Sequence, residues 1–320
     1  DFSSSLQIRV SGTLTGTGQV GDDDETTSNP EDPVDNAFLT FDPLQITGTA
    51  GFAIVRQTVD ADTDGNGTPD LLGGTLTSVA LTVTDAGVTI TDIAQLTVSG
   101  ELALATLAPA DPTTDTRSWM ALRMGNVTIA GGLDPALDIG LEAELSLQAV
   151  ELNLASDSAA TATGPEPSRL DWATAFDLNG DGTPDTVNPG ADLPSPKDLS
   201  IDFPSSLQIR VSGTLTGTGQ VGEDDATTTD PEDPVDNAFL TFDPLQITGT
   251  AGFAIVRQTV DADTDGNGTP DLLGATLTSV ALTVTDAGVT ITDIAQLTVS
   301  GELALATLAP ADPTTDTRSW

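Results

Sequence analysis

The sequence contains no cysteine, no histidine and no tyrosine, and its only lysine is Lys197. Without cysteine the chain has no disulfides and no thiolate ligands, and without histidine it has no imidazole metal site and no histidine base for catalysis. Zinc, copper and haem sites are therefore not expected. Aromatic residues make up only 4% of the chain, so we expect a core built from Leu, Val, Ile, Ala and Thr.

Basic residues are also scarce: 9 Lys and Arg stand against 49 Asp and Glu, which gives a net charge of −40. Such a chain repels nucleic acid and anionic lipid, so we expect neither as a partner. Its self-repulsion must be offset by bound cations or by high salt, which indicates either a calcium-containing extracellular location or a saline one. No apolar run approaches the roughly 20 residues that span a bilayer, so the sequence predicts no membrane span.

The chain repeats itself. Residues 1–119 recur as residues 202–320, and only six of the 119 aligned pairs differ. The differing pairs are Ser3/Pro204, Asp22/Glu223, Glu25/Ala226, Ser28/Thr229, Asn29/Asp230 and Gly74/Ala275. Repetition this faithful is typical of long arrays, in which every added copy extends the structure. We expect one repeat of 201 residues made of 1–119 and 120–201, a partial second repeat at 202–320, a longer parent array, and sub-units near 1–36, 37–74, 75–118 and 119–201.

Alternating apolar and polar residues predict strands. Every second residue from Leu137 to Ala149 is apolar, and one apolar face per strand is typical of antiparallel sheets. The segments Asp85–Gly87 and Gly125–Asn126 separate such runs and are predicted hairpin turns. We predict an all-β fold with negligible helix: an elongated repetitive antiparallel sheet structure, either β-solenoid-like or a continuous β-sandwich array, with one continuous sheet favoured.

An Asp-containing corner followed by a strand occurs four times per repeat. The corners begin at Asp42, Asp92, Asp134 and Asp202. Each is predicted to follow a short strand, the last at residues 199–201. Proline at the first residue of a strand removes no ladder hydrogen bond, and Asp before it favours a turn. We interpret the corners as structural turns.

Three loops carry Asp and Asn at alternate positions. The motif Asp-Thr-Asp-Gly-Asn-Gly-Thr-Pro-Asp occupies residues 62–70 and 263–271, and a variant occupies residues 177–185. Oxygen ligands at positions 1, 3 and 5 converge on one hard cation, glycine at position 6 permits a sharp turn, and position 9 contributes directly or through water. This spacing predicts a cation site in each loop.

The spacing resembles the first nine positions of EF-hand loops and the wider family of aspartate-rich calcium loops in thrombospondin-type and dockerin-type repeats. It departs at position 12, where the EF-hand has a bidentate Glu and this chain has Gly73, Asn188 or Gly274. The resemblance implies several bound Ca²⁺ ions with dissociation constants of about 10⁻⁴ to 10⁻³ M. The implied ligands are Asp62, Asp64, Asn66, Asp70, Asp177, Asn179, Asp181, Asp185, Asp263, Asp265, Asn267 and Asp271, with Asp60 and Asp261 as sources of the missing carboxylate.

A plain turn between strands is the alternative interpretation of each loop. Two carboxylates held about 4 Å apart at an effective dielectric near 20 repel by roughly 4 kcal/mol, a cost that a divalent cation removes, and this favours a calcium site. The acidic stretches 22–25 and 31–35 are further calcium loops or solvated loops. Arg117 and Trp119, which recur as Arg318 and Trp320, suggest a cation–π pair or a sugar-stacking surface, with ordinary packing as the favoured interpretation.

Tandem fidelity, acidity, absence of cysteine and Asp-rich loops together resemble the giant tandem-repeat surface proteins and adhesins of bacteria. The resemblance implies a structural segment of an extracellular filament, stalk or surface coat, rigidified by calcium, whose partners are neighbouring repeats and identical chains in a fibre. The alternative is an adhesin module that binds glycan or another surface. We do not expect an enzyme, because nearly all carboxylates lie in turn motifs and basic residues are few.

Overall fold

The computed structural model describes residues 5–16, 37–41, 44–90, 94–133, 140–158, 167–218, 238–242, 245–291, 294–312, 316 and 318. The first copy and the part that follows it contain strands β1 (Leu6–Thr15), β2 (Ala37–Phe41), β3 (Leu44–Thr47), β4 (Thr49–Ala61), β5 (Leu71–Ile90), β6 (Ala94–Ala108), β7 (Arg117–Leu133) and β8 (Gly140–Asp157), then a 3-10 turn η2 (Pro189–Asp192). The second copy contains β9 (Leu207–Gly217), β10 (Ala238–Phe242), β11 (Leu245–Ala262), β12 (Leu272–Ile291) and β13 (Ala295–Ala309).

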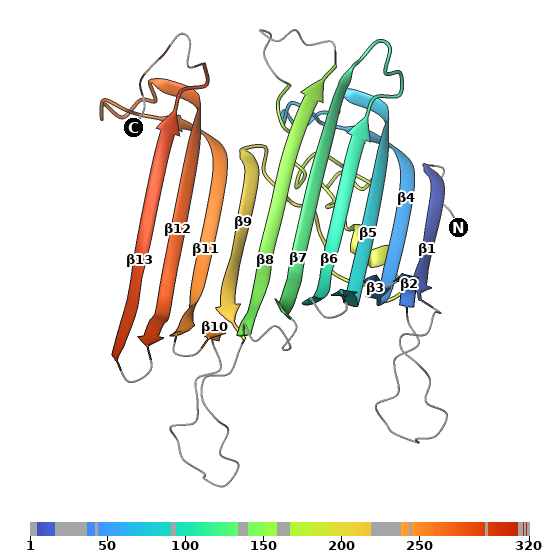
Figure 1. Ribbon diagram of the computed structural model, residues 1–320. Helices are drawn as coiled ribbons and strands as arrows, with labels where there is room; N and C mark the ends of the chain where they lie inside the picture. Colours follow the sequence, from blue (N-terminus) through green and yellow to red (C-terminus); the bar gives the residue numbers. More distant parts are fainter. Residues whose placement is uncertain are drawn as a thin grey trace.

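These strands form one antiparallel sheet that runs through both copies (Figure 1). The order is β1-β4-β5-β6-β7-β8, then β9 with β10, then β11-β12-β13. β9 and β10 share one strand position, because each pairs with β8 on one side and with β11 on the other. The predicted all-β, elongated antiparallel sheet with negligible helix is confirmed, and within the described ranges it is a single layer.

The two copies join through strand pairing. β8 of the first repeat pairs with β9 of the second from Ala143↔Gly217 to Leu152↔Ile209. β9 is the counterpart of β1, so the strand that forms one edge of the sheet in the first copy is an interior strand in the second. Each copy therefore covers the edge that the other would expose, as edge strands require.

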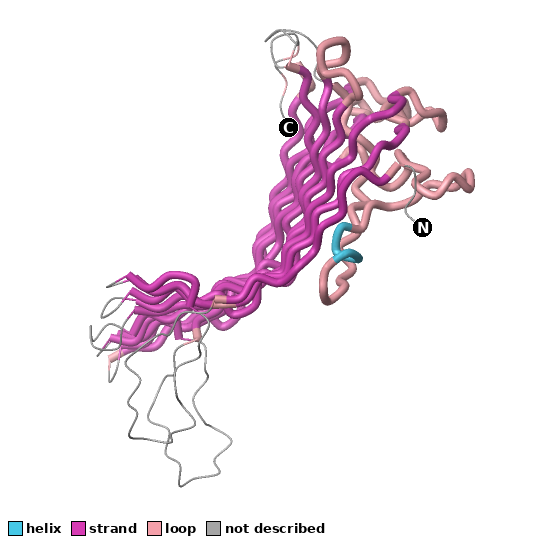
Figure 2. Tube along the Cα trace, turned by 90° about the vertical axis from the view of Figure 1, so that its right-hand side faces the viewer, coloured by secondary structure: helices cyan, strands magenta, loops and turns pink. Residues whose placement is uncertain are grey.

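The sequence predicted hairpin turns at residues 85–87 and 125–126, and this prediction is wrong. The strands continue through both positions and bend there. Asp85 and Asn126 lie inside the continuous strands β5 and β7. Their φ angles of 47° and 51° are positive, and the register shifts between Val83 and Ala86 because β5 carries one extra residue. A β-bulge and a tight hairpin both use Asp, Asn and Gly at positive φ, which explains the wrong prediction. Figure 2 shows the whole sheet bending, as bulges cause strands to do.

The bend requires close backbone approach at Gly100. A Cβ atom there would lie 2.8 Å from Val127 Cγ2 and 3.1 Å from its Cα, whereas at the equivalent Gly301 nothing lies within 4 Å. We expect Gly100→Ala to lower the free energy of unfolding by about 1–3 kcal/mol through overpacking, and Gly301→Ala to leave it nearly unchanged. Chemical denaturation of the two variants tests this, and equal effects would contradict it.

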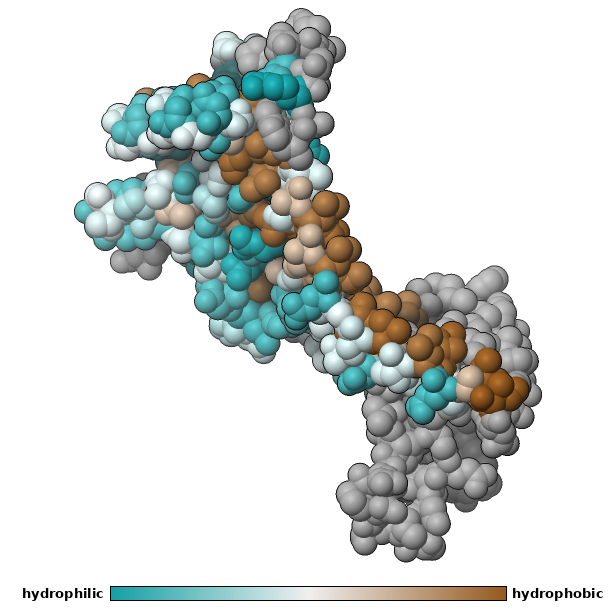
Figure 3. Space-filling view, turned by 90° about the vertical axis from the view of Figure 1, so that its left-hand side faces the viewer, coloured by the Kyte–Doolittle hydropathy of each residue, from teal (hydrophilic) through white to brown (hydrophobic). Residues whose placement is uncertain are grey.

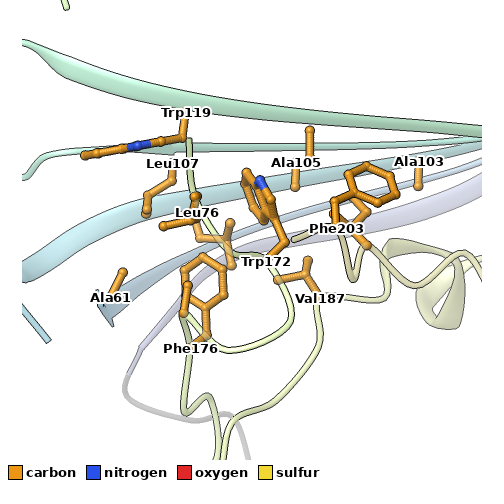
Figure 4. Close-up of a cluster of buried hydrophobic side chains, with 14 of the residues drawn as sticks. Ala61, Leu76, Ala103, Ala105, Leu107, Trp119, Trp172, Phe176, Val187 and Phe203 are labelled. Atoms are coloured by element: carbon orange, nitrogen blue, oxygen red, sulfur yellow. The ribbon is translucent and has the colours of Figure 1, made fainter. Parts of the chain in front are cut away.

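In the first copy, one face of the sheet is covered by residues 167–206, here called the cover segment, whose Trp172, Phe176 and Phe203 pack against the strands (Figure 4). Its largest side chains are buried: Trp172 is 0%, Phe176 1% and Phe203 2% exposed. They pack in one cluster with Leu76 and Leu107 of the sheet. The expectation of a core without aromatic side chains is therefore wrong, because the few aromatic residues are concentrated in this non-repetitive segment. The predicted strand at residues 199–201 is only an isolated bridge between Ile201 and Val187.

The other face, here called the open face, is apolar and uncovered within the described ranges. Strand pairing sets one row of apolar side chains across it from Phe52 to Leu305: Phe52, Leu81, Leu102, Met124, Val150, Val211, Ile255, Val280 and Leu305. Exposure is highest at the two edges of the sheet: Leu14 on β1 is 57% exposed, and Leu303 and Leu305 on β13 are 59% and 56% exposed. Figure 3 shows the apolar surface along this side of the sheet. The alternation seen in the sequence thus corresponds to two different faces, one covered and one open.

The remaining corners, at Asp42, Asp92 and Asp134, lie outside the described residues, as do the acidic stretches 22–25 and 31–35. Among the described residues, no helix is long and apolar enough to cross a membrane.

Candidate metal centre

The loop at residues 62–70 connects β4 to β5 and is built around Asp62. The Oδ1 atom of Asp62 accepts hydrogen bonds from the N–H groups of Gly65 (2.7 Å) and Asn66 (3.2 Å), and Oδ2 accepts one from Gly67 (2.6 Å). Gly65 and Gly67 have φ angles of 75° and 85°, a conformation that glycine adopts without strain. The glycines thus let the backbone wrap around one carboxylate.

The last aspartate of the loop closes it. Asp70 Oδ1 accepts the N–H of Thr63 at 2.6 Å and Oδ2 accepts its hydroxyl at 2.7 Å. Asp64 accepts the backbone N–H of Asn66 at 3.1 Å and its side-chain amide at 2.9 Å. These bonds fix three carboxylates in one small loop.

The fixed carboxylates form a group that could hold a metal ion. One carboxylate oxygen from each of Asp62, Asp64 and Asp70 lies within 4.8 Å of the other two, and the second copy repeats the group with Asp263, Asp265 and Asp271. Asn66 and Asn267 lie in the same loops, where each donates its side-chain amide to the neighbouring Asp and accepts a backbone N–H through Oδ1. A cluster of hard oxygen atoms suits Ca²⁺ or Mg²⁺.

The third loop has the same backbone scheme without the same cluster. Asp177 accepts the N–H groups of Gly180 (2.7 Å) and Gly182 (2.9 Å), and Asp185 accepts that of Leu178 (2.8 Å). Asn179 replaces the aspartate at position 3, and Asp181 at position 5 accepts both the N–H and the hydroxyl of Thr183. In the described part of the chain, the metal-compatible groups of three carboxylates are those of the other two loops.

Asp60 and Asp261 are not members of the two three-carboxylate groups. Asp60 Oδ1 accepts the N–H of Gly73 at 2.7 Å, and Asp261 Oδ1 accepts that of Gly274 at 2.8 Å. Gly73 and Gly274 adopt φ angles of 64° and 63°. These two carboxylates therefore stabilise the start of the next strand.

Arg117 is a member of the site that sequence reasoning missed. It forms a paired ion contact with Asp115, with Nη2 2.8 Å from Oδ2, and its Nη1 lies 3.7 Å from Asp70 Oδ2. It also lies over the ring of Trp119 at 5.2 Å, and Trp119 is 2% exposed, so that ring is packed and has no free face for a sugar. The second copy repeats the contact between Arg318 and Asp271 at 3.7 Å. No sequence signal singled out this arginine, because almost every residue of the first copy recurs in the second.

The cover segment connects two of the acidic loops. Ala61 forms a bridge with Phe176, and the N–H of Asp62 donates to the carbonyl of Ala175 at 3.0 Å. Ala61 and Phe176 precede the loops at residues 62–70 and 177–185, so these loops start from paired backbone. Figure 4 shows both residues at the buried cluster. Order in the loops is thus connected to packing in the core.

The first loop aspartate has a lowered pKa in both copies. Burial is the largest single influence on Asp62 and works to raise its pKa, but the N–H groups of Gly67 and Gly65 and the neighbouring Asp64 together outweigh it, so the pKa is lowered. In the second copy the N–H of Gly268, the equivalent of Gly67, is the main cause of the lowered pKa of Asp263. Each of these N–H groups donates to its aspartate at 2.6 Å. The same hydrogen bond therefore favours the ionised carboxylate in both loops.

The aspartate that closes the second-copy loop is shifted in the same direction. The N–H and the hydroxyl of Thr264 lower the pKa of Asp271, and the positive charge of Arg318 adds to their effect. Thr264 donates its N–H to Oδ1 at 2.6 Å and its hydroxyl to Oδ2 at 2.7 Å. The loop thus holds this carboxylate in the charged form that a cation would bind.

The lowered pKa of Asp62 predicts a pH-dependent contribution to stability. A carboxyl group whose pKa is lower in the folded than in the unfolded state contributes stability above its unfolded pKa, and this contribution is lost as the pH falls through the folded pKa. We expect the difference in unfolding free energy between wild type and Asp62→Asn, in calcium-free buffer, to shrink between about pH 7 and about pH 3. Chemical denaturation at both pH values measures it. Taking the difference between two proteins cancels the general effect of the net charge, and a difference that does not change with pH would contradict the prediction.

Comparison with known proteins identifies no relative. No family model, no curated protein and no solved structure matches this chain. The chemistry of the acidic loops and the topology of the sheet therefore carry the functional argument.

Proposed function

We propose that this chain is a structural segment of an extracellular repeat protein, in which each repeat extends one continuous sheet and Ca²⁺ in the acidic loops stiffens it. The observation that carries the proposal is the pairing of β8 with β9, which joins one repeat to the next by the same backbone hydrogen bonds that hold each repeat together. A sheet joined in this way lengthens with every copy.

The topology sets the length that one repeat adds. A repeat occupies six strand positions: β1 with β2, β3 with β4, and then β5, β6, β7 and β8. Neighbouring strands lie about 4.8 Å apart, so a repeat advances the array by roughly 29 Å before twist is considered. The 201 residues of a repeat thus form a short, broad unit of a ribbon.

The acidic loops support the calcium part of the proposal. They lie between successive strands, at β4–β5 and β11–β12, so each ion would hold one strand connection. Weak sites of this type are typical of extracellular modules, where calcium is abundant. Identical chains in a fibre and neighbouring repeats are the proposed partners, and the cell surface is the proposed location.

Proteins with two, three and four complete repeats test the proposal. Small-angle X-ray scattering or electron microscopy should show the long dimension growing by about 29 Å for each added repeat. Repeats that form separate domains joined by linkers would instead give a variable spacing and a flexible particle. That result would overturn the continuous sheet and with it the proposed structural role.

A further inference from the structure

The open face carries three adjoining apolar rows without a charged residue, although 49 of the 320 residues are Asp or Glu. The first is the row from Phe52 to Leu305. Strand pairing places a second row beside it: Ile54, Val79, Leu104, Leu122, Leu152 and Ile209. A third row runs from Val127 through Leu147 to Leu303. The second row ends at Arg257, which pairs with Ile209.

Acidic residues of the same strands face the covered side of the sheet. Glu101 Oε1 lies 2.9 Å from Lys197 Nζ of the cover segment. Arg123, the strand partner of Glu151, donates to the carbonyl of Ser200 in that segment at 2.6 Å. The strands thus keep their carboxylates away from the open face. Because like charges repel, a second acidic chain meets the least repulsion when it approaches over this face.

This arrangement is complete within the first repeat. Strands β4 to β8 have neighbours on both sides, and the cover segment packs on their other face. On the open face Ile54 and Leu154 are nevertheless 38% and 42% exposed. A further repeat adds strands beside these strands and not a layer over them, as the pairing of β8 with β9 shows. The open face therefore continues from one repeat to the next.

The area of the three rows is that of a stable interface. One side chain on a sheet face occupies about 4.8 Å across the strands and about 6.7 Å along them, or about 32 Å². The three rows thus cover about 700 Å² per chain, more than the largest apolar patch of a typical monomer, about 300–600 Å². Two such faces together would bury about 1,400 Å², within the range of about 1,200–2,000 Å² for specific interfaces. An apolar sheet face is stable when another layer packs on it.

We propose that the open face packs against the open face of a second copy of this chain, so that two sheets form two layers. The face has the period of the repeat, because Phe253 and Ile255 occupy in the second copy the positions of Phe52 and Ile54 in the first. A partner that covers such a face along its length must have the same period, and an identical chain has it. The inference rests on the proposed function in one respect, since that function makes identical chains the partners, and it names the surface through which they associate.

Charges placed on the open face test the pairing. Ile54→Glu with Ile255→Glu puts one carboxylate at the same open-face position of each copy, where the side chains are 38% and 39% exposed. Ser11→Glu with Ala306→Glu adds the same charge at exposed positions on the opposite face and is the matched control. Analytical ultracentrifugation of the full chain, in about 0.5 M NaCl to screen the net charge, should show a dimer for the wild type and for the control. The open-face variant should have a dimer dissociation constant raised by about 100-fold or more, because pairing would bury carboxylates without partners.

A single thiol gives a second measurement that does not depend on the folding of the Glu variant. Ile54→Cys introduces the only thiol of the chain on the open face, and Ser11→Cys introduces one on the opposite face. Labelling of Ile54→Cys with a maleimide should slow about tenfold when the chain concentration rises from about 1 μM to about 100 μM, because association follows mass action. Labelling of Ser11→Cys should not change.

Three outcomes would overturn the pairing. The first is a wild type that stays monomeric at about 100 μM, and the second is equal dimerisation of the open-face variant and its control. The third is a monomer whose labelling at position 54 is slowed by neutral phosphatidylcholine vesicles, which would show that lipid covers the face. The proposed function fails separately: repeats that do not lengthen the particle regularly would overturn the continuous sheet, whereas a dimer that forms through the open face would still support the pairing.

Discussion

We expect removal of calcium to lower the unfolding midpoint of this chain. A ligand that binds only the folded state stabilises it by RT ln(1 + [L]/Kd). With dissociation constants of about 10⁻⁴ to 10⁻³ M and about 10 mM Ca²⁺, each occupied loop contributes about 1.4 to 2.7 kcal/mol. Thermal unfolding followed by circular dichroism, in calcium and in chelator, measures the sum over the loops.

Variants separate the loops from a general effect of salt. Asp62→Asn combined with Asp263→Asn removes the central carboxylate of both three-carboxylate groups and should remove most of the calcium-dependent shift. Asp111→Asn, an exposed aspartate outside these groups, is the matched control and should keep it. A shift that survives in the double variant would show that calcium screens the net charge and does not bind the loops.

Loss of Trp172 will cost more than loss of any one calcium ion. Its side chain is 0% exposed, its Nε1 donates to Asn153 Oδ1 at 3.1 Å, and its ring lies 5.7 Å from that of Phe176. Truncation of a buried Trp to Ala typically costs about 3–5 kcal/mol. We expect Trp172→Ala to lower the unfolding free energy by this amount in chemical denaturation.

Two further variants help to interpret the loss of unfolding free energy in Trp172→Ala. Trp172→Phe keeps most of the apolar volume but removes the donor to Asn153, whose buried oxygen then lacks that bond, at a cost of about 1–3 kcal/mol. Leu72→Ala, at a residue that is 67% exposed, should change stability by less than about 0.5 kcal/mol. A loss below about 1 kcal/mol for Trp172→Ala would mean that the cover segment contributes little to folding.

The repeating part of the fold could be predicted from the sequence, because apolar and polar residues alternate along the strands with a period of two residues. Of the run that begins at Leu137, the residues from Gly140 onward lie in β8, and the three before it lie outside the described residues. The carboxylates of residues 62–70 also lie together as their spacing predicted. In both cases the pattern lies within one short segment, so it can be recognised without knowledge of the tertiary structure.

The predictions that were wrong or missing concern contacts between residues that are far apart in the sequence. Nothing in the Pro- and Ser-rich sequence around Trp172 shows that it packs on strands far away in the chain. Asp85 and Asn126 are of residue types that are common in hairpin turns. Only pairing with the neighbouring strands determines that the chain continues through a bulge at these positions. The contact between Arg117 and Asp70 likewise needs the sheet to bring β7 and the loop together.

The direction of the sheet determines how such an array would respond to force. Hydrogen bonds in a sheet run from strand to strand, which is also the direction in which repeats are added. Tension along the array therefore pulls the hydrogen bonds of a strand pair apart along their own axes, whereas shear would slide the two strands past each other. The cover segment crosses several strands and reaches the next repeat through Arg169, whose Nη1 donates to Thr259 Oγ1 at 3.1 Å. It would carry load across the strand pairs beneath it, so the strand pairs that it does not cross would separate first.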